Sequence, residues 1–314
     1  MDATPYSDQF FDQQAVGSLA SARIVLQELF SAATIGSVVD VGCGVAPWLR
    51  AAIDLGAQHA VGLDGSYVDR TRLMVEPARF HPCDLEADDI RQAVQGMPFD
   101  LAMCLEVAEH LPAARAPSFI AELCGLGDLV LFSAAVPNQG GTNHVNEQWP
   151  GYWAALFADQ GFACFDVLRP RVWDRDGCEW WYVQNTLLFA RHGTDAFNTA
   201  QRLGPPCTAP AALVHPRMLA HIIGYTGAHI GALEQVVRNQ PFERDATLRT
   251  LEAKVDRLRT MALEQQDQVD ALTAALDHTR AERDQLRREN DAFKASTSWR
   301  VTGPLRRAAR LLRR

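Results

Sequence analysis

The stretch Val38-Val39-Asp40-Val41-Gly42-Cys43-Gly44-Val45-Ala46 decides the fold class. A short apolar run that ends in an acid and two glycines, just before a helical pattern, is typical of a buried strand followed by a tight turn. Glycine is required where the backbone turns sharply and approaches a ligand closely, as at the first strand-to-helix turn of nucleotide-binding α/β folds. A Gly-x-Gly turn is also found as a purely structural turn, so its context has to decide between the two interpretations.

The context is a regular alternation of short apolar runs with longer amphipathic ones through residues 38–190. Buried parallel strands separated by helices produce this pattern, so we predict a doubly wound α/β sheet. The predicted strands are 38–41, 60–63, 99–105, 129–132, 163–168 and 186–190, with a further strand before residue 84.

Acidic residues follow several of these strands. Asp64 ends the second one, about 20 residues after the glycine turn, where a carboxylate can accept hydrogen bonds from both ribose hydroxyls of a nucleotide. Asp84 follows the third predicted strand, and Glu106 ends the fourth. This order of signals differs from that of an NAD-binding fold.

The set resembles the class I S-adenosylmethionine-dependent methyltransferases over about residues 5–191. Asp40-x-Gly42-x-Gly44 is similar to their first motif, and Glu106-Val-x-Glu109-His110-Leu111 to the fourth-strand motif of their bacterial small-molecule branch. The resemblance implies a Rossmann-like, mostly parallel seven-stranded sheet and S-adenosyl-L-methionine as cofactor. Ala46 departs from the first motif, which often has a third glycine there. The cofactor-binding residues that it implies are Asp40, Gly42, Gly44, Asp64 (ribose), Asp84 and Leu85 (adenine side), Leu105 and Glu106.

The segment 132–149, with Tyr152-Trp153 just after it, resembles a family of bacterial methyltransferases found with capsule and O-antigen synthesis. This resemblance implies O-methylation of a sugar or glycan hydroxyl in cell-surface polysaccharide synthesis. Within the segment we predict His144 as the general base, because the ordinary pKa of histidine suits proton abstraction near neutrality. A histidine that only orders the loop is the alternative. Trp149 and its aromatic neighbours are interpreted either as a sugar-stacking surface or as core.

Other functions are compatible with the same cofactor motifs. The acceptor could be a lipid or another small molecule, or the fold could be a catalytically idle scaffold assembled by the C-terminal region. Glu109 and His110 could cap the next helix. The spacing of histidines and acids does not compel a metal, so we expect no metal site.

The composition restricts which functions, partners and cellular locations remain possible. A net charge of −8 on a chain with six arginines in its last 15 residues leaves an acidic body, which argues against nucleic acid as a partner. The seven cysteines include no C-x-x-C pair, so neither a disulfide framework nor a zinc site is indicated. With no apolar run long enough to span a membrane and no secretory signal, we expect a cytoplasmic protein.

The C-terminal third has a different organisation. We predict a methyltransferase domain over residues 1–195, a linker and helical connector over 196–245, a coiled coil over 246–295 and a basic amphipathic tail over 296–314. A coiled coil would make the chain a homo-oligomer, whereas a lone helix packed on the body is the alternative. The predicted a and d positions are Leu248, Leu251, Val255, Leu258, Ala262, Val269, Leu272, Leu276, Leu286 and Phe293.

The tail resembles, at residues 296–306, an ending found on bacterial polysaccharide methyltransferases and glycosyltransferases. Its arginines predict contact with the inner face of the membrane or with a glycosyltransferase, because basic amphipathic segments bind anionic lipid surfaces. A solvated basic end without a partner is the alternative.

Overall fold

The computed structural model describes residues 8–224, with side chains from residue 16 onward, and scattered positions between 227 and 292. Its contacts divide the chain into two compact units, Met1–Met218 and Leu219–Arg314. The sheet and all residues expected to bind the cofactor belong to the first unit.

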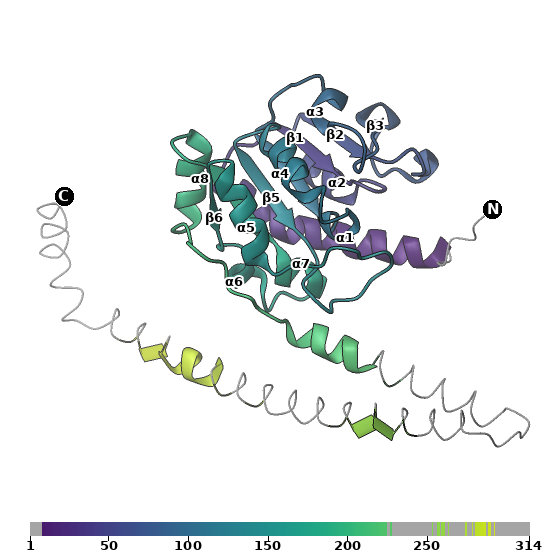
Figure 1. The fold of residues 1–314 in the computed structure, drawn as a ribbon. Coiled ribbons are helices and arrows are strands. Elements are labelled where there is room, and N and C mark those ends of the chain that lie inside the picture. Colours follow the sequence, from purple (N-terminus) through teal and green to yellow (C-terminus); the bar gives the residue numbers. More distant parts are fainter. Residues whose placement is uncertain are drawn as a thin grey trace, which may run out of the picture. The chain divides into compact units, whose positions relative to one another are not determined.

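The first unit alternates strands with helices along the chain (Figure 1). The elements are α1 (Asp8–Phe30), β1 (Ser37–Val41), α2 (Pro47–Asp54), β2 (His59–Asp64), η1 (Arg70–Arg72), η2 (Pro77–Arg79), β3 (Phe80–Pro82), α3 (Ile90–Ala93), β4 (Leu101–Leu105), η3 (Ala108–His110), α4 (Ala116–Cys124), β5 (Leu129–Ser133), α5 (Pro150–Asp159), β6 (Phe162–Phe165), α6 (Arg169–Val172), α7 (Trp180–Asn185), β7 (Leu187–Arg191) and α8 (Asp195–Leu203).

The seven strands form one sheet in the order β3-β2-β1-β4-β5-β7-β6. Strands β1 to β5 pair in parallel, whereas β7 is antiparallel to both of its neighbours. The predicted Rossmann-like, mostly parallel seven-stranded sheet is confirmed. Because β1 and β4 are adjacent although far apart in sequence, the strand order reverses beside β1, which is where doubly wound sheets bind ligands.

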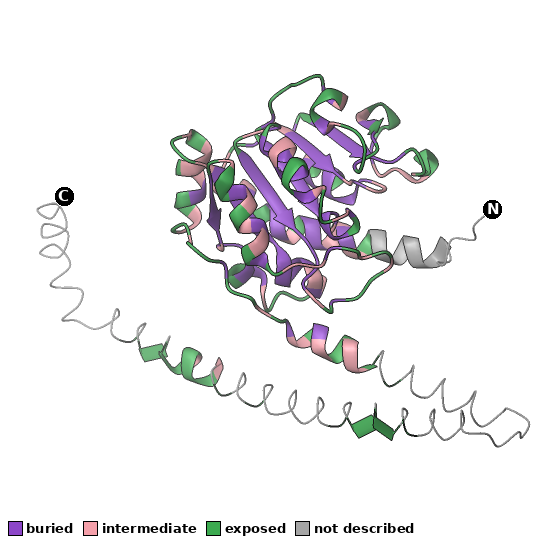
Figure 2. Cartoon of the chain, viewed as in Figure 1, coloured by how far each residue is buried: buried purple, intermediate pink, exposed green. Residues whose placement is uncertain are grey.

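Alternate residues of each central strand enter different cores, because side chains of a strand point to opposite faces. Val38 lies in one buried cluster with Leu26 of α1 and Leu49 of α2. Val39 lies in a second buried cluster with Phe119 of α4 and Phe157 of α5. Figure 2 shows the consequence, a sheet buried on both faces beneath helices that are exposed on their outer sides. Its near-continuous burial explains why the strands were visible as uninterrupted apolar runs.

Helix α1 is held by an apolar stripe at helical spacing. Ala22, Val25, Leu26 and Leu29 recur at intervals of three and four residues, and all are fully buried. This stripe closes one face of the sheet.

Residues 196–218 also belong to the first unit. Helix α8 follows β7 directly, Arg169 donates to the carbonyl of Ala211, and the backbone N–H of His215 donates to Gln184 Oε1 at 2.7 Å. The compact unit therefore continues beyond residue 195, where the methyltransferase domain was expected to end.

The predicted coiled coil over 246–295 lies largely outside the described residues, and the basic tail over 296–314 lies wholly outside them. Among the predicted seam positions only Leu286 is described, with 64% of its surface exposed. Both features stay predictions from the sequence. No helix in the described part of the chain has the length and apolarity required to cross a membrane.

Candidate functional site

The turn after β1 carries three residues in the left-handed region of backbone space. Gly42 has a φ of 77°, Gly44 of 53° and Ala46 of 64°. A Cβ on Gly42 would lie 2.3 Å from a methyl carbon of Val107, so this glycine allows the turn to pack against the chain after β4. A Cβ on Gly44 would have nothing within 4 Å. Gly44 therefore leaves open space beside the backbone, as a ligand-approach position requires.

Ala46 occupies the position of the missing third glycine and nevertheless adopts its conformation. It is the residue before α2, and it is 1% exposed. The left-handed conformation costs a residue with a Cβ about 1 kcal/mol or more, and burial of the Ala46 methyl group in the core offsets part of that cost.

The carboxylate of Asp64, at the end of β2, faces the same turn. Its Oδ2 accepts from the backbone N–H of Gly44 at 2.7 Å, and its Oδ1 accepts from the N–H of Gly65 and the hydroxyl of Tyr67, each at 2.6 Å. Tyr67 is 84% exposed, so its hydroxyl approaches Asp64 from the solvent side. The predicted ribose acid is thus placed beside the open glycine, with a tyrosine hydroxyl on one of its oxygens.

Asp40 lies in β1 beneath this turn and is 3% exposed. Burial, and then the negative charge of Asp64, raise the pKa of Asp40 to about 8, although a hydrogen bond from the backbone of Leu49 acts in the opposite direction. The raised pKa favours the protonated form of Asp40 below about pH 8, and its hydrogen bond with Leu49 joins β1 to α2.

Asp84 and Leu85 follow β3, farther along the same edge of the sheet. Asp84 Oδ1 accepts from the backbone N–H groups of Glu86 and Ala87 at 3.0 and 3.3 Å, so its carboxylate closes a local turn. Leu85 is buried. Their expected contact with an adenine ring stays a prediction.

A second group of polar side chains lies after β4. Glu106 has a φ of 56°, and its carboxylate accepts from Gln139 Nε2 at 2.7 Å and from Asn185 Nδ2 at 3.0 Å. Burial raises the pKa of Glu106, and hydrogen bonds from Asn185, Ser133 and Gln139 counteract it. Leu105, just before it, is buried.

Gln139 and Asn185 are site residues that the sequence did not single out. Gln139 lies in the loop after β5, which was quoted only as a polar stretch, and Asn185 ends α7, remote in sequence from every motif. Only the fold brings Asn185 to Glu106, so no sequence pattern could have identified it.

The loop after β5 is organised by Glu147. Its carboxylate accepts from the backbone N–H groups of Asn138 at 2.7 Å and Gly140 at 3.0 Å, and it lies 2.8 Å from His144 Nδ1. The predicted base is therefore oriented by an acid on its own loop. Its role as a base stays a prediction.

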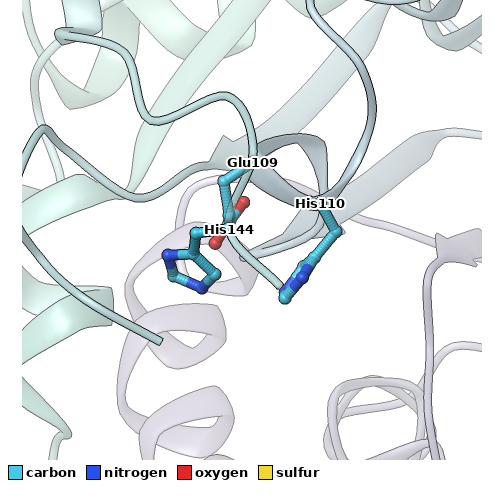
Figure 3. A group of neighbouring side chains, drawn as sticks. All are labelled: Glu109, His110 and His144. Atoms are coloured by element: carbon cyan, nitrogen blue, oxygen red, sulfur yellow. The ribbon is translucent and has the colours of Figure 1, made fainter. Parts of the chain in front are cut away.

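His144 lies beside two residues of η3, as Figure 3 shows. The rings of His110 and His144 make a T-shaped contact with centroids 4.8 Å apart. Partial burial of its ring, and then the neighbouring His144, lower the pKa of His110, whereas a hydrogen bond with the backbone of Asn143 raises it. Glu109 is fully buried, and burial, followed by the charge of Glu106, raises its pKa well above the usual range.

Glu109 does not act as a helix cap in this arrangement. Its backbone carbonyl accepts from the N–H groups of Val145 and Asn146 at 2.9 and 3.0 Å, which joins η3 to the loop of His144. No hydrogen bond of good geometry reaches its side-chain oxygens among the described residues, although the backbone N–H groups of Glu109 and Ala135 partly counteract the rise in its pKa.

The aromatic residues after the loop divide between core and surface. Trp153 is 2% exposed and packs against Phe132, with ring centroids 5.3 Å apart, so it belongs to the core. Trp149 is 41% exposed and immediately precedes α5. Trp149 is the most exposed of the expected stacking residues, whereas Tyr152 is partly buried against the core.

Comparisons with known proteins detect similarity in structure only. No family model matches the chain, and no curated protein matches it in sequence. Magnesium protoporphyrin IX methyltransferase from Synechocystis, crystallised with S-adenosylhomocysteine, aligns at 20% identity over 61% of this chain and 90% of that chain, with a TM-score of 0.41.

Two further methyltransferases align in a similar way. An O-methyltransferase family protein from Burkholderia thailandensis aligns at 18% identity over 55% of each chain, with a TM-score of 0.40. An S-adenosylmethionine-dependent methyltransferase from Archaeoglobus fulgidus aligns at 16% identity over 50% of this chain and 75% of that chain, with a TM-score of 0.41. Similarity at this level carries no conclusion about the ligand or the acceptor of this chain.

Proposed function

We propose that this chain is an S-adenosylmethionine-dependent methyltransferase that methylates a hydroxyl of a sugar or glycan in cell-surface polysaccharide synthesis. The observation that supports it most directly is the pairing of an open glycine, Gly44, with the carboxylate of Asp64 across the ends of two adjacent parallel strands. The strand order reverses beside them, and this is where doubly wound sheets bind nucleotides.

The residues at this turn fit the cofactor. Gly44 offers space for close approach to the methionine and ribose parts. Asp64 offers carboxylate oxygens to the ribose hydroxyls once the hydroxyl of Tyr67 is displaced, because a carboxylate accepts about four hydrogen bonds and the two backbone donors can stay. The bound cofactor supplies an activated methyl group. The chain has to align the acceptor with it and accept a proton from the acceptor hydroxyl.

A hydroxylated acceptor suits the loop after β5. This loop places a histidine oriented by Glu147 near the carboxyl edge of the sheet, and an exposed Trp149 follows it. Aromatic rings stack on the apolar faces of sugars while nearby polar groups bind the hydroxyls. A lipid acceptor would instead require an extended apolar surface beside the loop.

Transfer of a labelled methyl group tests this function. The full chain is incubated with labelled S-adenosylmethionine and, in separate reactions, with nucleotide sugars, lipid-linked glycans and membrane lipids. We expect label in the sugar or glycan fraction, and we expect it to be released with the sugar after the lipid is cleaved off. The variant Asp64→Asn is the control for transfer that depends on the cofactor site.

Each other outcome has a definite meaning. Label retained on the lipid part alone would replace the sugar acceptor by a lipid. Tight cofactor binding without transfer to any fraction would favour the idle-scaffold alternative. Transfer that is equal in wild type and Asp64→Asn would contradict the assigned cofactor site.

A further inference from the structure

Three side chains with metal-ligating atoms meet at the carboxyl edge of the sheet. Glu109 and His110 come from η3 after β4, and His144 comes from the loop after β5. One nitrogen from each histidine and one oxygen of Glu109 lie within 4.8 Å of one another, and Figure 3 shows the three side chains grouped around one space.

Glu109 is the member that most requires a partner. The residue is 0% exposed, and the donors close to its carboxylate, the backbone N–H groups of Glu109 and Ala135, do not form hydrogen bonds of good geometry with it. An ionised carboxylate that is buried without donors is strongly disfavoured, whereas coordination to a cation removes that cost. Its backbone carbonyl accepts hydrogen bonds from Val145 and Asn146, so η3 is held against the loop of His144.

His144 has the orientation expected of a ligand. A carboxylate only accepts hydrogen bonds, so Nδ1 of His144 is the donor in its 2.8 Å contact with Glu147. In the neutral ring this leaves the lone pair on Nε2. A histidine whose other nitrogen donates to a carboxylate is the usual arrangement of metal-binding histidines. Glu147 is itself fixed by two backbone N–H groups.

Space beside this nitrogen is kept free by Gly141. A Cβ at that position would lie 2.3 Å from His144 Nε2, so any other residue would collide with the imidazole ring at this nitrogen. His110 is exposed, its ring contacts that of His144, and it makes a hydrogen bond with the backbone of Asn143. Ligand atoms about 2.0–2.2 Å from one ion lie about 3.3–3.6 Å apart in a tetrahedron, so the three side chains have to approach one another by about an ångström to bind it.

We propose that Glu109, His110 and His144 bind one divalent transition-metal ion, with Glu147 as the residue that positions His144. Two imidazoles and one carboxylate suit Zn²⁺, Co²⁺ and Fe²⁺, and they leave coordination positions open. This departs from the expectation of no metal site, which rested on spacing along the chain. His144 is 34 residues after His110 in sequence, so the pattern is visible only in the fold.

The metal site adds to the proposed function. Its use in catalysis rests on that function, whereas ion binding does not. A divalent ion lowers the pKa of a hydroxyl that it binds, so an acceptor held in an open position would lose its proton at neutral pH. In that case His144 is a ligand, and the acceptor proton leaves to solvent or to another base.

Cobalt binding tests the proposal independently of catalysis. The full chain, without a histidine tag and stripped of metal by a chelator, is titrated with Co²⁺ and followed by calorimetry and by visible absorption. We expect one ion per chain, displaced by Zn²⁺ but not by an equal concentration of Mg²⁺. His110→Ala, His144→Ala and Glu109→Gln should each weaken binding at least 100-fold, and Glu147→Gln about 10- to 100-fold.

Two controls keep the result interpretable. His192→Ala changes an exposed histidine that follows β7, and it should leave the affinity unchanged. His110→Ala changes an exposed residue, so it tests the site even if Glu109→Gln does not fold. No binding by wild type, or binding that survives both His110→Ala and His144→Ala, would overturn the proposal.

The same samples are titrated with S-adenosylhomocysteine, which separates the two claims. Cofactor binding without cobalt binding contradicts only the metal site. Cobalt binding without cofactor binding contradicts the proposed methyltransferase and leaves the metal site standing.

Discussion

The backbone N–H of Gly44 donates a 2.7 Å hydrogen bond to Oδ2 of Asp64, which joins the turn after β1 to the end of β2. The contact joins two sequence motifs that are 20 residues apart. It also means that the carboxylate is already oriented before any ribose is bound. Binding energy is then not spent on ordering this side chain.

Tyr67 should compete with the cofactor for Asp64. Its hydroxyl donates to Oδ1 at 2.6 Å, at an oxygen that the ribose hydroxyls would use. Tyr67→Phe removes this bond and should strengthen binding of S-adenosylhomocysteine by a factor of a few, since about 1.4 kcal/mol corresponds to tenfold. Calorimetry of wild type and variant measures the change. Weaker binding by the variant would mean that Tyr67 contacts the cofactor instead of being displaced by it.

Gly42 and Gly44 should respond differently to the same substitution. Gly42→Ala places a Cβ 2.3 Å from Val107 at a φ of 77°, so the free energy of unfolding should fall by about 2–4 kcal/mol from collision and backbone strain together. Gly44→Ala has strain but no collision, and should cost about 1 kcal/mol while weakening cofactor binding. Denaturant unfolding and cofactor titration of both variants check this. Equal losses of stability would contradict the assigned packing.

Asp40 should make stability depend on pH. Its pKa is about 8 in the folded protein and about 3.9 when unfolded, so between these values the native state holds a proton that the unfolded state has released. Stability from this group is complete below about pH 4 and is lost as the pH rises toward 8, by at most about 1.4 kcal/mol per unit. In Asp40→Asn that part of the slope should vanish. Unfolding of both proteins at about pH 5, 6, 7 and 8 measures it, and parallel curves would refute the buried, protonated Asp40.

Trp149 should contribute to binding of the acceptor and not to binding of the cofactor. The residue is 41% exposed, so Trp149→Ala should cost little stability. Loss of a stacking contact worth about 0.5–1.5 kcal/mol should raise the KM for a sugar acceptor about two- to tenfold and leave cofactor affinity unchanged. Trp149→Tyr, which keeps an aromatic ring, should restore most of the difference. An unchanged KM in both variants would remove Trp149 from the acceptor site.

The fold was predictable because its strands are buried on both faces. Uninterrupted apolar runs such as 129–132 indicate such strands directly. Because β1 and β2 are adjacent and parallel, an acid at the end of β2 is expected beside the turn after β1, and Asp64 lies there. Ala46 shows the limit of reading motifs by residue type: its backbone has the conformation of the missing glycine, with a φ of 64°.

Contacts between distant segments were not predictable. Asn185 reaches Glu106 only because β7 runs antiparallel to β5 and brings the end of α7 to the carboxyl edge. Glu109, His110 and His144 meet only because β4 and β5 are neighbours. The region 196–245 was expected to begin as a linker because it carries Pro and Gly, yet the carbonyl of Ala211 accepts a hydrogen bond from Arg169 of the domain, which no local pattern encodes.

Titration of S-adenosylhomocysteine into the full chain tests the central claim most directly. We predict saturable binding of one molecule per chain by calorimetry. Asp64→Asn should weaken this binding by about 1.5–3 kcal/mol through loss of a charge-assisted hydrogen bond. Asp69→Asn, at an exposed acid that caps η1, should bind like wild type. Absence of binding by the folded wild-type chain, or equal affinity in wild type and Asp64→Asn, would contradict the account.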